Sequence, residues 1–128
     1  MLRTIVLSIL IASLTILQLG CSPPEPGSPD WLVGTWDAGK SGPLDHAAVI
    51  EFFDDGTGRW TDHRNSGQLY VIEFRWSLTQ STQLVLTETK PNERKSREAV
   101  ITKLTPNSFA LAGRDGGSRG EILLTRSP

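Results

Sequence analysis

The segment 69–78 shows the most regular alternation of apolar and polar side chains in this chain. Apolar residues stand at every second position, namely Tyr70, Ile72, Phe74, Trp76 and Leu78. A period of two residues places the two sets of side chains on opposite faces of a β-strand. The segment therefore predicts a strand with one face in a core.

Shorter alternating runs of the same kind recur along the chain after residue 30, and clusters of Gly, Pro, Asn, Asp and Ser separate them. Strands are predicted at 31–37, 47–53, 57–62, 69–78, 83–89, 98–105, 108–113 and 120–126. The fold class is all-β. Eight sequential antiparallel strands form either an up-and-down barrel or two packed sheets, and the barrel is favoured because closure removes both exposed edges.

The hairpin AVIEFF-DDG-TGRW allows a test of strand register. A three-residue loop at 54–56 with glycine last suits a type I turn closed by a left-handed glycine bulge, and it sets Phe52 opposite Gly58. A two-residue turn would instead place Phe52 opposite Arg59 and mix apolar and charged side chains on one face. The three-residue loop is therefore predicted.

The first 20 residues have the layout of a secretory signal: a basic start at Arg3, then an apolar run that ends at Gly20-Cys21. The run is short for a transmembrane anchor, which needs about 20 apolar residues. Gly20-Cys21 resembles the lipobox of bacterial lipoproteins. The resemblance implies that 1–20 is a lipoprotein signal peptide, that Cys21 carries acyl chains, and that Ser22 directs the protein to the outer membrane, facing the periplasm. An ordinary signal peptide is the alternative.

Four prolines lie in the segment 22–29, which has little to bury. Such a composition predicts an extended, semi-rigid spacer. The chain therefore divides into the signal at 1–20, a proline-rich tether at 21–30 and one folded domain at 31–128.

Composition excludes several classes of protein. Without Arg3 the chain has 12 basic and 14 acidic residues, a net charge of −2, whereas nucleic-acid binders carry a basic excess. The single cysteine excludes an internal disulfide framework and a multi-cysteine metal site. The charged segment 90–96 is interpreted as a solvated hairpin tip rather than a phosphate-binding patch, since Glu93 accompanies its basic residues.

Three short motifs resemble those of small bacterial lipocalin-like domains: LVGTW at 32–36, FDDGTG at 53–58 and LLTR at 123–126. The resemblance implies an eight-stranded lipocalin-like barrel. It also implies structural roles for Gly34 and Trp36 at the closed end of the barrel, with Arg126 packed over the tryptophan.

Two functions are compatible with such a domain. The first is binding of a small apolar ligand, for which Tyr70, Phe74 and Trp76 are the candidate contacts. The second is a non-enzymatic protein-binding module with a filled barrel, such as an inhibitor of a secreted enzyme or an envelope-assembly accessory. Val49 and Phe53, apolar on the face predicted to point outward, favour the second.

No catalytic constellation is visible, so the chain is expected not to be an enzyme and to hold no cofactor. The two histidines, His46 and His63, lie at the ends of the two strands of one hairpin. In the predicted register they point to opposite faces, which argues against a metal site. Trp31 is expected at the mouth of the domain beside the tether.

Overall fold

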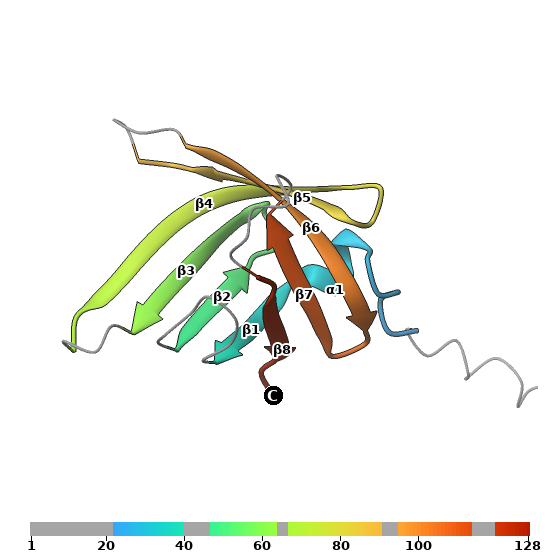
Figure 1. Cartoon of the computed structure of the whole chain (residues 1–128). Helices are drawn as coiled ribbons and strands as arrows, with labels where there is room; N and C mark the ends of the chain where they lie inside the picture. Colours follow the sequence, from blue (N-terminus) through green and yellow to red (C-terminus); the bar gives the residue numbers. More distant parts are fainter. Residues whose placement is uncertain (1–21, 40–46, 64–66, 91–94, 114–119) are drawn as a thin grey trace, which may run out of the picture.

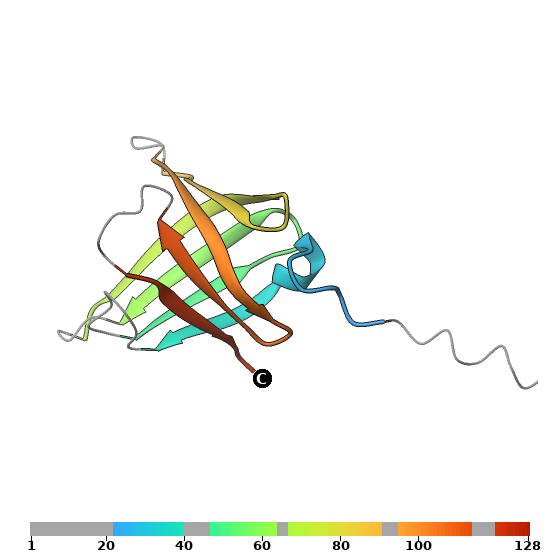
Figure 2. The same cartoon turned by 45° about the vertical axis from the view of Figure 1, so that its right-hand side comes forward.

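The computed structural model describes residues 22–39, 47–63, 67–90, 95–113 and 120–128. In this part of the chain, eight antiparallel strands form a closed barrel in sequence order, and β8 pairs with β1 (Figures 1 and 2). The elements are α1 (Pro29–Leu32), β1 (Gly34–Gly39), β2 (Ala48–Phe52), β3 (Thr57–His63), β4 (Leu69–Thr79), β5 (Gln83–Glu88), β6 (Ser96–Thr105), β7 (Ser108–Gly113) and β8 (Ile122–Arg126). The predicted barrel is confirmed, and the two-sheet alternative is not.

The predicted first strand, 31–37, is wrong at its start, because Trp31 and Leu32 belong to α1. Ser28 caps this short helix, its hydroxyl accepting a hydrogen bond from the Trp31 backbone N–H at 3.2 Å. Pro29 takes the first helical position, where its fixed φ favours helix and its missing N–H costs nothing. These local signals outweigh the apolar run, so β1 begins at Gly34.

The hairpin of β2 and β3 has the predicted register. The Phe53 backbone N–H donates to Thr57 O at 2.8 Å, and Phe52 lies opposite Gly58. Gly56 has a φ of 82°, the left-handed conformation that the three-residue loop requires. Asp55 accepts hydrogen bonds from the Thr57 hydroxyl and N–H, and these lower the pKa of its carboxyl group.

The alternation along β4 is also as predicted. Phe74 is buried at 3% exposure, whereas Leu69 and Val71 on the other face are 63% and 41% exposed. The same parity holds across the sheet and directs one set of side chains into the barrel. The largest fully buried interior side chains are Trp36, Ile50, Phe52, Leu84, Ile101, Phe109 and Leu124, together with Leu32 from α1.

One end of the barrel is covered by α1, and we call it the closed end (Figure 2). Trp31 is 2% exposed and contacts the rings of Trp36 and Phe109 at centroid distances of 5.1 and 5.4 Å. The expectation that Trp31 lies at the mouth of the domain is therefore wrong: the helix turns its side chain into the barrel. The indole N–H groups are satisfied, with Trp31 donating to Pro106 O at 3.0 Å and Trp36 to Leu32 O at 2.8 Å.

Arg126, at the end of β8, completes this closed-end cluster of Trp31, Trp36, Phe109 and Arg126. Its guanidinium carbon lies 4.2 Å from the centroid of the Trp36 ring. The same group donates hydrogen bonds to Val33 O at 3.2 Å and Trp31 O at 2.5 Å. Desolvation lowers the pKa of Arg126, but its guanidinium remains charged at neutral pH.

Gly34 makes room for the arginine. Its φ of +135° is one that other residues rarely adopt, and a Cβ at this position would lie 2.9 Å from Arg126 Nη1. The β1 strand can therefore pass under the guanidinium only with glycine there.

The contact between Trp36 and Arg126 should give a measurable coupling free energy in a double-mutant cycle. Trp36→Ala loses a buried ring and should lower the free energy of unfolding by about 3–5 kcal/mol. Arg126→Ala should cost about 1–2 kcal/mol, from the cation–π contact and two hydrogen bonds. Urea unfolding should show that the two losses fail to add by about 0.5 kcal/mol or more, because they share one contact.

The matched control pairs Trp36→Ala with Arg59→Ala. Arg59 is exposed and bonded to Glu51 on the outer wall, so these two losses should be additive. Additivity in the Trp36–Arg126 pair as well would mean that the barrel does not depend on this contact to join its first and last strands.

Candidate functional site

The end of the barrel opposite α1 is where β1, β3, β5 and β7 finish and the strands after them begin, and we call it the open end. Burial of the inner face varies along the barrel: Ala38 and Ala48 at the open end are buried, whereas Trp76 and Leu78 nearer the closed end are only partly buried. Around α1 the interior is fully buried, as at Trp36 and Phe109. Several apolar interior residues farther along are only partly buried: Trp60, Ile72, Leu86, Ala99 and Ile122. We call these five residues the apolar wall; Trp60 and Ile72 lie opposite each other on β3 and β4.

The structure does not bring the three predicted ligand contacts together. Tyr70, Phe74 and Trp76 share the inner face of β4, but they lie at different depths. Tyr70 is 40% exposed at the open end, while Phe74 is buried and packs edge-on against Phe52 at 5.8 Å. Of the three, only Tyr70 lies at the accessible end.

Trp76 has a structural role nearer the closed end. Its indole N–H donates to Phe53 O at 3.2 Å and to Thr57 O at 2.9 Å, the two carbonyls that flank the β2–β3 loop. Its ring packs edge-on against Phe52 at 5.5 Å. The side chain therefore fastens this hairpin loop to β4.

Charged side chains lie on the inner face where the strands reach the open end, and sequence reasoning missed them. Lys90 Nζ lies 5.6 Å from the centroid of the Tyr70 ring, within cation–π range. Arg97 Nη2 lies 3.6 Å from Glu88 Oε1. Asp62, opposite Tyr70 on β3, is buried at 7% exposure.

We call these residues the charged rim: Asp62, Glu88, Lys90 and Arg97, with Tyr70. Their position could have been found from the alternation itself. Leu84 and Leu86 point inward, so a period of two continues to Glu88 and then to Lys90. Because these residues stand near a predicted loop, their charged side chains were instead expected to be exposed to solvent.

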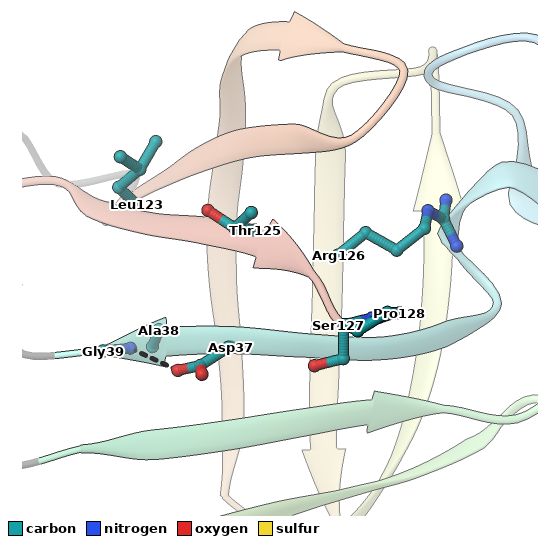
Figure 3. A pocket seen from close by; sticks show the side chains of 8 residues that line it. All are labelled: Asp37, Ala38, Gly39, Leu123, Thr125, Arg126, Ser127 and Pro128. Atoms are coloured by element: carbon teal, nitrogen blue, oxygen red, sulfur yellow. Dashed lines mark hydrogen bonds between the residues drawn. The ribbon is translucent and has the colours of Figure 1, made fainter.

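The larger of two surface pockets, about 370 Å³, lies on the outside of the seam between β1 and β8 (Figure 3). Among the described residues, those strands pair at Trp36 with Arg126 and at Asp37 with Thr125, and the Ser127 backbone N–H donates to Thr35 O at 2.9 Å. Arg126 is one of the residues that line the pocket, and the end of its side chain extends toward the start of the domain (Figure 3). The second pocket, about 220 Å³, adjoins Val33 and Phe53 at the closed end. Neither enters the barrel.

Of the two histidines considered as metal ligands, His46 lies outside the described residues. His63 is exposed, and its backbone N–H donates to Ala47 O at 3.0 Å. Among the described residues, no group of three or more His, Cys, Asp and Glu side chains is placed to hold a metal ion. Cys21 also lies outside the described residues.

The barrel can be compared with known proteins. The crystal structure of a lipocalin-like protein from Bacteroides uniformis matches this chain with a TM-score of 0.53 at 11% identity, over 76% of this chain and 99% of that one. The fold is lipocalin-like. At this identity the likeness of the two lipocalin-like barrels concerns the fold alone. No family model matches the chain, and no curated protein matches it in sequence.

A search of the described residues for a helix long and apolar enough to span a membrane finds none.

The histidines lead to a prediction for the lipocalin-like barrel. Calorimetric titration with Zn²⁺ should show no one-to-one site tighter than about 100 μM, because His63 points outward from β3. His63→Ala should leave the titration unchanged. A stoichiometric site that is lost both in His46→Ala and in His63→Ala would contradict this prediction.

Proposed function

We propose that this protein is a lipid-anchored lipoprotein of the cell envelope whose barrel binds a small, largely apolar ligand at its open end. The observation that carries the proposal is the apolar wall of Trp60, Ile72, Leu86, Ala99 and Ile122, which lies inside the barrel and is still partly exposed. Binding inside a concave fold gains about 25 cal/mol of free energy for each Å² of apolar surface that the ligand removes from water.

The packed closed half limits the size of this ligand. Leu32, Phe52 and Phe109 leave almost no exposed surface there, and an eight-stranded barrel is just wide enough to hold one small ligand. The ligand therefore occupies the open half and does not reach Trp36.

The charged rim gives the site its polar component. Binding sites commonly combine apolar walls with a few polar groups that fix the ligand's orientation. Lys90 and Arg97 supply donors, while Asp62 and Glu88 supply acceptors. Arg97 and Glu88 form an ion pair, which supports binding rather than acid–base catalysis.

The anchor rests on the sequence. The signal at 1–20 and the Gly20-Cys21 junction support acylation of Cys21, and Ser22 supports sorting to the outer membrane on its periplasmic side. Two or three acyl chains hold a protein stably at a membrane, whereas one is marginal.

A second candidate function, binding of an envelope protein, is favoured by one observation. Leu69 and Val71 point outward from the start of β4 and are 63% and 41% exposed. Exposed apolar side chains on the outer wall suit contact with a protein partner rather than with a small ligand.

Ligand binding can be tested with N-phenyl-1-naphthylamine, an uncharged apolar dye that fluoresces when it leaves water. Ala99→Trp would fill the open half of the barrel and should weaken dye binding about tenfold or more, equivalent to about 1.4 kcal/mol. Fluorescence titration of the purified domain measures this change.

Ser96→Trp is the matched control, because Ser96 lies on the same strand, is exposed and faces outward. It should bind the dye as the wild type does, and urea midpoints should verify that both variants fold. Equal binding by Ala99→Trp and wild type, or no binding by wild type, would contradict the ligand site and leave the protein-binding alternative.

The proposed anchor predicts how the Cys21→Ser variant divides between the membrane and soluble fractions. Without an acylated cysteine the variant should move from the membrane fraction to the soluble fraction after fractionation of expressing cells, since no other lipid attachment is proposed. A variant whose leader is removed and that still partitions with membranes would rule out Cys21 as the anchor.

A further inference from the structure

The chain before α1 is docked onto the closed end. Gly27 is buried, and a Cβ at this position would lie 3.1 Å from Ser81 Cβ and 3.8 Å from Leu104 Cδ1. The Ser28 backbone N–H donates to Glu25 O at 3.0 Å, which forms a turn just before the helix. The tether is therefore fixed to the barrel at Gly27.

Only a short piece of chain separates this fixed point from the proposed anchor. Residues 22–26 are exposed. Six Cα-to-Cα steps join Cys21 to Gly27, and at about 3.3–3.6 Å each they span at most about 20–22 Å. Prolines at 23, 24 and 26 favour an extended form of about 3.1 Å per residue, which reduces the reach slightly.

The barrel is longer than this reach. The β4 strand has 11 residues, which span about 36 Å at about 3.3 Å each. A strand tilt of about 40° reduces its projection on the barrel axis to about 28 Å. If the closed end pointed away from the membrane, Gly27 would stand about 28 Å above the bilayer, beyond the reach of the tether.

The two turns beside the docked tether carry no charged side chain, although the exposed Glu25 and Asp30 lie next to them on the tether and α1. The turns consist of 80–82 and 104–107, and we call them the exit face; all but Thr82 are exposed. Leu104 is 37% exposed, and its Cδ1 lies 3.8 Å from the position of a Cβ at Gly27. An uncharged surface can lie against lipid headgroups without the cost of desolvating ions.

The β2–β3 turn, which also lies at the closed end, is acidic. Asp54 and Asp55 are both exposed at the tip of the β2–β3 hairpin. Anionic lipids would repel this turn. The barrel should therefore lean toward the exit face and hold the two aspartates away from the bilayer.

From the tether length and the charge distribution we infer that the anchored barrel stands with its closed end toward the phospholipid bilayer, resting on the exit face. The open end then faces the aqueous compartment, so the ligand enters from solution and not sideways from the anchoring membrane. The inference rests on the proposed acylation of Cys21.

The test places one fluorescent label at each of three positions in the full-length protein, reconstituted in vesicles of phosphatidylethanolamine and phosphatidylglycerol with an acceptor-labelled headgroup. Asn107→Cys reports on the exit face, Asp54→Cys on the acidic turn and Gln68→Cys on the open end; all three sites are exposed. Energy transfer should fall in that order and should be at least about twofold greater for Asn107→Cys than for Gln68→Cys. Equal or greater transfer at Gln68→Cys would overturn the inference.

Labelling stoichiometry separates failure of the orientation from failure of the anchor. An acylated Cys21 has no free thiol, so each variant should take up one dye per chain. Two dyes per chain together with loss of vesicle binding would reject the anchor itself, and the orientation with it.

A lengthened tether tests the cause of the orientation. Twelve Gly and Ser residues inserted after Ser22 add up to about 40 Å of reach, more than the barrel length. The difference between Asn107→Cys and Gln68→Cys should then fall below about twofold. A difference that persists would overturn the assignment of the orientation to tether length.

Discussion

The stacking of Arg126 on Trp36 is the contact on which the closed barrel depends. Among the described residues, the β1–β8 ladder has two residue pairs, and one of them joins these two residues. So short a ladder contributes few backbone hydrogen bonds, so the side chains must secure the seam. The guanidinium does this by covering the indole ring at 4.2 Å while it binds two carbonyls that precede β1. One side chain thus ties the last strand to α1 and to the first strand.

The barrel could be predicted from the sequence because strand alternation is a local signal. Each run of apolar and polar residues fixes which side chains point inward, and the bulged β2–β3 loop fixes a register without any knowledge of the rest. The start of the domain could not be predicted in the same way. Leu32 and Val33 belong to an apolar run typical of a strand, whereas Ser28 and Pro29 carry the signals of a helix start, and the two overlap within a few residues. The helix-start signals prevail, and the helix then packs Trp31 onto Trp36.

The candidate site was less predictable, and its residues show why. Alternation places Tyr70, Phe74 and Trp76 on one face, but it carries no information about depth along the barrel axis. Depth depends on the tilt and stagger of all the strands, which are long-range properties. The charged rim was missed for a related reason: Glu88 and Lys90 stand near a predicted loop, where solvent exposure is the usual outcome. Only barrel closure turns that position into part of an interior.

The two ends of the barrel have different physical requirements, and this separation allows stability and binding to be adjusted independently. At the closed end, Trp31, Trp36 and Phe109 exclude water and tolerate little change, because each ring contacts the other two. At the open end, Ile72 and Ala99 contribute less buried surface, so substitutions there should alter what the barrel can hold at a smaller cost in folding. The tether also leaves from the closed end. If Cys21 is acylated as proposed, the part of the domain that carries most of its stability would be held nearest the anchor, and the adaptable part would lie farthest from it.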